Sequence, residues 1–228
     1  MLVVVGLLSQ KGGVGKSTLA RAIAAAGVRG GITTRIADLD SQQVTVGEWG
    51  ERRDDEGIEP AIPIVAVRNA AEALGSARQG DQLLVVDGAA RTGTDTLDMA
   101  LGADLIIQPC GAGYDDLDPA IRFFHELSAA GVPKDRLVVA LCRIATEREE
   151  EMARRYIGKL GYAVLPGSIP EKASFRDAHN RGLAVSEVAQ EPLKSKVDVV
   201  VNAIFERLTA IMKAKVLSEQ HVPRRNQQ

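Results

Sequence analysis

The chain has 228 residues, of which 45% are apolar and 25% charged, and a formal net charge of −2. This composition predicts one soluble globular domain and excludes a membrane-spanning protein, because no apolar run approaches the roughly 20 residues that cross a bilayer. There is no overall basic surplus for nucleic acid, although residues 171–228 carry 10 basic and 7 acidic side chains, so any polyanion-binding surface is expected there.

Short apolar runs alternate with amphipathic segments along the chain. Strands are expected at Leu2–Leu8, Thr34–Ala37, Ile64–Val67, Leu83–Val86, Leu105–Ile107, Leu137–Leu141 and Ala163–Leu165. Helices are expected at Lys16–Val28, Arg68–Arg78, Thr94–Leu101, Leu117–Ala130, Glu147–Leu160 and Lys196–Leu217. Most of the apolar runs are continuous rather than alternating, as in strands that are covered on both faces. The pattern predicts an α/β fold with a mostly parallel twisted sheet, helices on both faces, and ligands beyond the carboxyl ends of the strands.

The segment SQKGGVGKST, residues 9–18, lies between the first expected strand and the first expected helix. We interpret it as a phosphate-binding loop of the G-x-x-x-x-G-K-[ST] type, because strand, glycine loop and helix follow one another. The backbone N–H groups of Gly13 to Ser17 would face the phosphates at the positive end of the helix. Lys16 would reach the β- and γ-phosphates, and the Ser17 hydroxyl would bind Mg²⁺.

A second lysine, Lys11, precedes these glycines. It lies too early in the loop to share the role of Lys16, and two cations on one phosphate tail would repel each other. A lysine at this position can instead project outward, toward a nucleotide held by a second subunit.

The stretch KGGVGKST resembles the deviant Walker A signature of the ParA/MinD family of ATPases. The resemblance extends from Leu2 to about Leu217 and is strongest to short plasmid-partition members, which lack an N-terminal DNA-binding domain. It implies that Lys11 reaches across an ATP-sandwich homodimer. It also implies that ATP with Mg²⁺ is the cofactor, and that the nucleotide contacts come from Gly12, Gly13, Val14, Gly15, Lys16, Ser17 and Thr18.

Three aspartates end apolar runs. The segment RIADLDSQQ contains Asp38 and Asp40, and LLVVDGAA contains Asp87. The resemblance implies that Asp40 orients the attacking water and that Asp38 helps hold the Mg²⁺ shell, although Ser41 stands where the family usually has proline. Asp87 occupies the position of a Walker B acid, which holds Mg²⁺. The alternatives are that Asp38 and Asp40 only cap the next helix and that Asp87 is a turn residue without a metal role.

The segments ALCRIAT and GSIPEKASFRDA follow the two last expected strands. In the family the matching loops flank the adenine, so Arg143, Ile169 and Pro170 are candidates for packing on the base. A surface ion pair is the alternative role for Arg143. Family relatives bind DNA without sequence preference through basic residues in this region. The candidates here are Lys172, Arg176, Arg181, Lys194 and Lys196. The alternative is an ordinary solvated face.

The last expected helix, Lys196–Leu217, has one stripe of Val, Ile and Leu, which indicates packing on the sheet rather than binding to a membrane. The domain is therefore expected to cover residues 1–217, with a disordered tail over 218–228. Cys110 and Cys142 have no partner at metal-binding spacing and are expected to be buried free thiols of a cytoplasmic protein. The isolated histidines are given no catalytic role. Trp49 is expected to pack the segment that senses the γ-phosphate.

The resemblance implies an ATPase that dimerises on ATP, coats nucleoid DNA non-specifically, and is released when a ParB-like or other small cargo-bound adaptor stimulates hydrolysis. The cargo would be plasmid or chromosomal DNA. One alternative is the positioning of a protein cargo, such as a chemoreceptor cluster or carboxysome. Others are a MinD-like membrane switch, against which the polar tail argues, and a metabolic ligase, which need not use Lys11. No membrane partner is expected.

Overall fold

The computed structural model describes residues 1–40, 45–89 and 93–220. The strands are β1 (Val3–Leu7), β2 (Thr34–Asp38), β3 (Ile64–Ala66), β4 (Leu83–Asp87), β5 (Leu105–Cys110), β6 (Leu137–Ile144), β7 (Ala163–Val164) and β8 (Ile169–Pro170). The α-helices are α1 (Lys16–Arg29), α2 (Thr45–Asp55), α3 (Ala70–Leu74), α4 (Thr94–Gly102), α5 (Tyr114–Ala129), α6 (Glu147–Lys159), α7 (Ala173–Asn180) and α8 (Glu191–Gln220). Two short 3₁₀ helices, η1 (Lys134–Arg136) and η2 (Val185–Glu187), precede β6 and α8.

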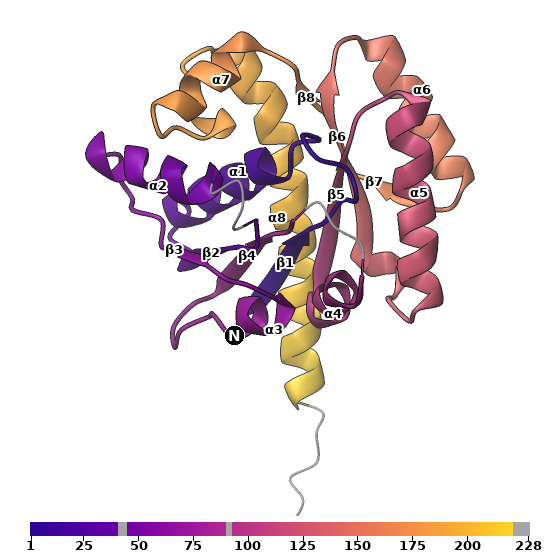
Figure 1. Ribbon diagram of the computed structural model, residues 1–228, viewed down its shortest axis with the longest axis horizontal. Coiled ribbons are helices and arrows are strands. Elements are labelled where there is room, and N and C mark those ends of the chain that lie inside the picture. Colours follow the sequence, from indigo (N-terminus) through magenta and orange to yellow (C-terminus); the bar gives the residue numbers. More distant parts are fainter. Residues whose placement is uncertain (41–44, 90–92, 221–228) are drawn as a thin grey trace, which may run out of the picture.

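One sheet carries the whole arrangement (Figure 1). Its strand order is β3-β2-β4-β1-β5-β6-β7, with β8 paired to the far end of β6. Every one of these pairings is parallel. The predicted α/β fold is therefore confirmed. The loops that leave the carboxyl ends of β1, β2, β4, β5 and β6 share one edge, where parallel sheets bind their ligands.

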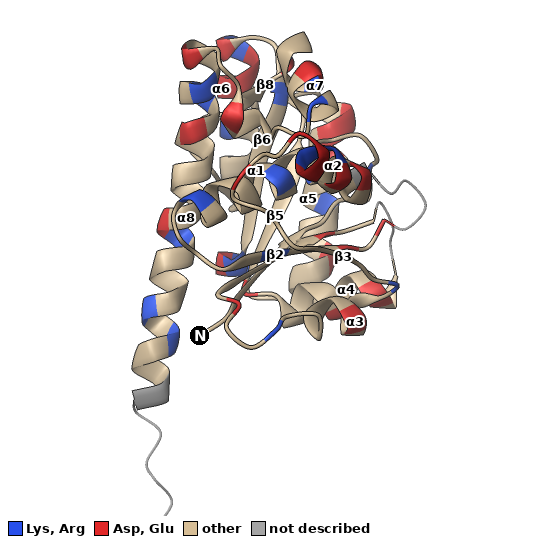
Figure 2. Ribbon diagram, turned by 90° about the vertical axis from the view of Figure 1, so that its left-hand side faces the viewer, with Lys and Arg blue, Asp and Glu red and all other residues tan. Residues whose placement is uncertain are grey.

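Two apolar cores cover the two faces of the sheet, because successive side chains of each strand point to opposite sides. Val3, Val5 and Leu7 of β1 pack with α1, α2, α7 and α8. Val4, with Leu8 just beyond the strand, packs with α3, α4, α5 and α6. Both cysteines are free and buried, as expected, but they belong to opposite cores. Figure 2 shows many charged residues on α2 and α6. The strands carry fewer, namely Arg35, Asp38, Asp87 and Arg143.

Helix α8 runs along the sheet from the loop edge to the opposite edge (Figure 1). Val197, Val200 and Ile204 are fully buried in the core, which confirms that this helix packs on the sheet. Near its end the Lys215 ammonium lies 2.6 Å from a carboxylate oxygen of Asp104. None of the helices within the described residues has the length and apolarity that crossing a bilayer requires.

The structure differs from the sequence-based expectation in a few elements. Helix α3 covers only Ala70–Leu74 of the expected Arg68–Arg78, because the Asn69 side chain caps its start and Gly75 ends it. Helices α2 and α7 were not expected, since each has few apolar residues, and strand β8 was not expected because it has only two residues. Helix α8 continues to Gln220, so the first part of the expected disordered tail is helical. Residues 221–228 lie outside the described part.

Phe124 should be one of the more sensitive core positions, because its ring is fully buried among α5, the sheet and Tyr162. We expect Phe124→Ala to lower the free energy of unfolding by about 3–5 kcal/mol through lost burial and a residual cavity. Met152, which is 51% exposed on α6, provides the control, since Met152→Ala should change stability by less than about 0.5 kcal/mol. Urea unfolding followed by circular dichroism measures both values, and equal midpoints for the two variants would contradict the expectation.

Candidate functional site

The loop between β1 and α1 has the backbone shape of an anion cradle. Gly13 and Gly15 have φ angles of +70° and +111°, in the left-handed region that favours glycine. Gly15 is the N-cap of α1 and no described side chain caps it, so the first N–H groups of the helix remain available to phosphate oxygens. Gln10 stands where the G-x-x-x-x-G-K-[ST] pattern has its first glycine. Its φ is not positive, so the missing glycine leaves the cradle unstrained.

The two lysines of the loop occupy different environments. Lys16 is largely buried, and its ammonium donates to the carbonyl oxygen of Lys11 at 3.3 Å, inside the loop. Burial lowers the Lys16 pKa, and the carboxylates of Asp87 and Asp40 oppose that effect. The Lys11 side chain is half exposed, leaves the loop on the other side, and forms an ion pair with Asp116 on α5. Its hydrogen bond to Asp116 raises the Lys11 pKa.

Two carboxylates face each other at the ends of adjacent strands. The register of β2 and β4 pairs Asp38 with Asp87, and both residues are buried, at 3% and 1% exposure. The Asp38 carboxylate accepts hydrogen bonds from the backbone N–H of Asp40, at 2.9 Å, and of Gly47 in the first turn of α2. The alternative capping role considered for Asp38 is thus realised through Gly47.

Asp87 is the electrostatically exceptional group of the site. Neither of its carboxylate oxygens has a hydrogen-bond partner of ordinary geometry within the described residues. Burial raises its pKa to about 7, with the nearby Asp38 charge adding to the effect, while the Ser17 hydroxyl, Lys16 and Arg21 lower it. A buried acid with unsatisfied oxygens beside a hydroxyl fits Mg²⁺, which combines one or two carboxylates with phosphate and water oxygens. Ser17, Asp87 and Asp38 are the residues that would hold it.

A cavity of about 290 Å³ lies on one side of the loop, and its lining includes the residues predicted to contact the base. Gly13, Gly15 and Thr18 form one wall, and Ile169 and Pro170 form another. The remaining lining residues include two from α7 that the sequence did not suggest, Phe175 and His179.

Arg143 lies between this cavity and a second one. Its guanidinium donates to the Gly13 carbonyl at 3.2 Å and lies 3.4 Å from a Glu171 carboxylate oxygen. The surface ion pair considered for Arg143 therefore exists, and the same side chain also ties the phosphate loop to the β8 segment. Stacking on a base remains a prediction.

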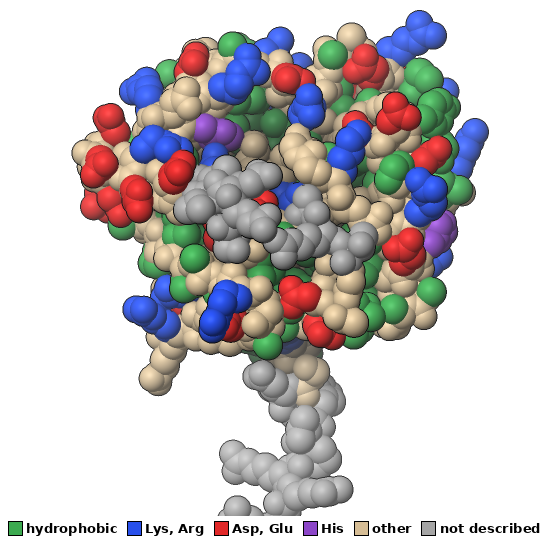
Figure 3. All heavy atoms as spheres, in the orientation of Figure 1, with side chains coloured by type: hydrophobic (Ala, Val, Ile, Leu, Met, Phe, Trp, Pro, Cys, Tyr) green, Lys and Arg blue, Asp and Glu red, His purple; other side chains and the backbone are tan. Residues whose placement is uncertain are grey.

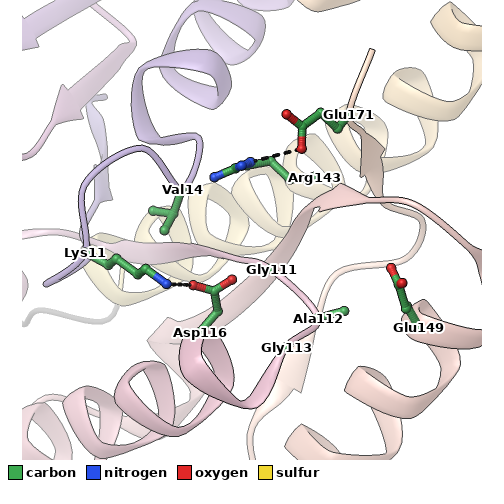
Figure 4. A pocket seen from close by; sticks show the side chains of 9 residues that line it. All are labelled: Lys11, Val14, Gly111, Ala112, Gly113, Asp116, Arg143, Glu149 and Glu171. Atoms are coloured by element: carbon green, nitrogen blue, oxygen red, sulfur yellow. Dashed lines mark hydrogen bonds and ion pairs between the residues drawn. The ribbon is translucent and has the colours of Figure 1, made fainter.

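The second cavity, of about 440 Å³, opens on the Lys11 side of the loop (Figure 4). Figure 4 shows the Lys11 and Asp116 side chains pointing toward each other at its rim, with Glu149 across the opening. Asp116 belongs to the site but was not among the predicted residues. It lies 105 positions from Lys11, and only the parallel pairing of β1 with β5 brings the two together.

The five DNA-binding candidates lie on two consecutive segments. Lys172, Arg176 and Arg181 flank or belong to α7, and all three are exposed. Lys194 and Lys196 lie in the first turns of α8, and Lys194 is paired with Asp198 at 2.6 Å. On the face in Figure 3, basic and acidic side chains are interspersed near the loop edge. Ser41, the departure noted next to Asp40, lies outside the described residues.

The buried charge of Asp87 should make the nucleotide-free protein less stable as the pH rises from about 4 toward about 7, above which the penalty stays constant. The folded-state pKa lies above the unfolded one, so folding disfavours the ionised form, and the penalty disappears as the pH falls toward 4. Asp87→Asn removes it. We therefore expect this variant to melt several degrees above the wild type at pH 8 and close to it at pH 5, at about 2–4 °C per kcal/mol.

Thermal melts without metal or nucleotide measure this effect, and parallel pH profiles for the two proteins would contradict it. Asp81→Asn is the control with the opposite sign. Although Asp81 is partly desolvated, the Arg78 N–H and the Arg35 guanidinium hold its pKa below the usual value. Asp81→Asn should therefore destabilise the protein at pH 8.

The comparisons with known proteins agree with this geometry. Residues 5–185 match the model of the CobQ/CobB/MinD/ParA nucleotide-binding domain family. No curated protein matches the sequence significantly.

Several solved structures share the fold at low sequence identity. The septum site-determining protein MinD of Pyrococcus horikoshii, complexed with Mg-ADP, has a TM-score of 0.72 at 14% identity over 92% of this chain and 99% of its own. A putative plasmid partition protein of Borrelia burgdorferi bound to AMPPNP gives 0.71 at 14%, over 91% and 100%. An ATP complex of an McdA variant from Cyanothece gives 0.67 at 16%, over 90% and 96%.

The family match covers most of the chain, and it includes the phosphate loop, the paired aspartates and the cavity beside them. This protein belongs to the CobQ/CobB/MinD/ParA family of nucleotide-binding domains.

Proposed function

We propose that this protein is a Mg²⁺-dependent ATPase that closes into an ATP-sandwich dimer and binds DNA without sequence preference. It releases the DNA when a cargo-bound adaptor stimulates ATP hydrolysis. Its role would be the segregation of plasmid or chromosomal DNA on the nucleoid. The observation that carries the proposal is the different placement of the two lysines: Lys16 lies inside the phosphate loop, whereas Lys11 projects out of it.

Each residue of the site has a distinct task in this proposal. The first N–H groups of α1 and the Lys16 ammonium bind the phosphates and offset their charge. Mg²⁺, when bound through Ser17, Asp87 and Asp38, would neutralise charge that develops on the transferred phosphoryl group. Asp40, whose N–H is held by Asp38, would orient the attacking water.

Lys11 acts in the dimer. In the single chain its ammonium is paired with Asp116, and both side chains are partly exposed, at 50% and 27%. An ion pair with that much solvent contact contributes little to stability, so Lys11 can leave Asp116 for the more strongly charged phosphates of a facing copy.

The exposed basic residues in and beside α7 support the DNA-binding part of the proposal, since non-specific binding needs phosphate contacts and no base-reading motif. The nucleotides named for the related structures, AMPPNP and Mg-ADP, support ATP with Mg²⁺ as the ligand. A ParB-like protein is the kind of adaptor that fits such a cycle.

A gel-shift assay with random-sequence DNA tests the nucleotide switch. We expect retardation with Mg·ATP and at least tenfold weaker binding with ADP or without nucleotide, because only the dimer doubles the number of phosphate contacts. Raising the salt concentration should weaken the ATP-dependent complex steeply. Equal shifts in all three nucleotide states would refute the proposal.

Lys11→Ala tests the sandwich. This variant should bind ATP yet remain monomeric, because removing the lysine leaves the partner's phosphate charge uncompensated at the interface. Lys134→Ala, which removes a lysine that packs over the Tyr162 ring instead, is the matched control and should dimerise normally. Light scattering coupled to size exclusion, in ATP with an Asp40→Ala background to slow hydrolysis, gives the masses. A dimer from Lys11→Ala at the wild-type ATP concentration would remove Lys11 from its role.

A further inference from the structure

Trp49 lies between two buried arginines. Its ring is fully buried in α2, with the Arg21 guanidinium carbon 5.5 Å from its centroid and the Arg53 guanidinium carbon 5.6 Å away. Both distances are within the range of cation–π attraction, which is stronger in a desolvated setting. The indole N–H donates to the Leu183 carbonyl oxygen at 3.2 Å. This side chain therefore ties α2 to α1 and to the segment after α7.

Arg53 anchors α2 to the segment that follows α7. The guanidinium forms a two-pronged ion pair with Glu187, at 2.8 and 3.0 Å, and also donates to the Gly182 carbonyl at 3.2 Å. Arg53 is 1% exposed, and the same Glu187 carboxylate accepts the Ala184 N–H at 2.8 Å. Bidentate pairs between arginine and a carboxylate are the most orientation-specific ion pairs, so this contact defines how α2 lies on the segment.

The close approach of the two backbones points the same way. Gly182 has a φ of +70°, and a Cβ atom there would come within 2.5 Å of the Arg53 backbone nitrogen. Any larger residue would push α2 away from the end of α7.

Arg21, the other arginine next to the Trp49 ring, connects α2 to the buried aspartates of the site. Arg21 belongs to α1, directly after the phosphate loop, and Asp87 and Asp38 both act on its guanidinium electrostatically. Asp38 in turn accepts the Gly47 N–H from the first turn of α2. The start of helix α2 is thus attached to Asp38 of the site. Farther along, Trp49 and Arg53 attach the same helix to the segment that follows α7.

Asp40 depends on this attachment. Its backbone N–H donates to the Asp38 carboxylate at 2.9 Å, and the same carboxylate accepts the Gly47 N–H from the first turn of α2. A displacement of α2 that moves Gly47 would therefore disturb the carboxylate that holds the Asp40 backbone. Helix α7, which precedes the segment that holds α2, contributes Phe175 and His179 to the wall of the cavity predicted to hold the base.

We propose that Arg53 and Glu187, together with Trp49 between Arg21 and Arg53, are positioning residues: they hold α2, and through it Asp40, in register with α7 and the nucleotide. None of the three is among the residues that line the cavity predicted to hold the base. The inference rests on the proposed function in assuming that ATP is bound and hydrolysed at this site.

Trp49 is the single tryptophan of the chain, so its fluorescence reports on this contact directly. Titration with Mg·AMPPNP should shift its emission with the same midpoint that calorimetry gives for binding. Binding by calorimetry with unchanged Trp49 emission would overturn this inference and leave the proposed function standing. The absence of any nucleotide binding by calorimetry would overturn both.

Arg53→Lys keeps the charge but loses the two-pronged pair. We expect kcat for ATP to fall at least tenfold, as misplacement by about 1 Å can cause, while the Kd for AMPPNP stays within about twofold of the wild type. Asp81→Asn breaks an equally buried pair, Arg35–Asp81 at 2.8 Å, at the opposite edge of the sheet, and should keep kcat within about twofold of the wild type. If Arg53→Lys does not fold, Trp49→Phe tests the same contact, because it keeps a ring between the arginines and loses the N–H.

The expected result is thus a loss of kcat that is confined to the Trp49–Arg53–Glu187 contact. Equal losses of kcat in Arg53→Lys and Asp81→Asn would mean that the contact contributes only to overall stability, and they would overturn the proposal. Unchanged turnover in Arg53→Lys, or in Trp49→Phe where that variant is used, would do the same.

Discussion

The parallel pairing of β2, β4 and β1 is the constraint on which the rest of the site depends. It places Asp38 opposite Asp87, and Asp87 opposite Leu7, just before the phosphate loop begins. A shift of one residue in either register would turn these side chains to the other face of the sheet. Because both carboxylates are buried, nearby positive charges must offset their negative charge. Lys16 and Arg21 on α1 offset part of it, and a bound cation would offset the rest.

Much of this arrangement could be read from the sequence because it is locally encoded. Continuous apolar runs predicted seven of the strands, and the glycine pattern before Lys16 predicted the turn into α1. Asp38 and Asp87 followed from their places at strand ends. Helix α2 escaped prediction because Val46 and Trp49 are the only buried apolar residues described in it, and most of their neighbours are charged.

The contacts between distant segments could not be predicted. Arg53 meets Glu187 across 134 positions of sequence, and Lys11 meets Asp116 across 105. Neither pair leaves a local signal, since each is decided by the order of strands in the sheet and by the packing of helices over it.

Contacts between loops hold the nucleotide edge together. Arg143 adopts a φ of +60°, which costs a residue with a Cβ atom about 1–2 kcal/mol. In that conformation its guanidinium meets both Gly13 and Glu171. Backbone strain of this kind is typical of functional sites, where neighbouring contacts over-determine one conformation. Here it joins the phosphate loop to β8, and α7 follows directly.

Helix α8 has a practical consequence for work with this protein. Its 30 residues span about 45 Å, and the bond from Lys215 to Asp104 pins its far end beside the starts of β1 and β5. A fluorophore, affinity tag or surface tether attached beyond this helix would therefore emerge on the side of the domain farthest from the phosphate loop. Immobilised or labelled molecules would keep their nucleotide edge open to approach by another copy.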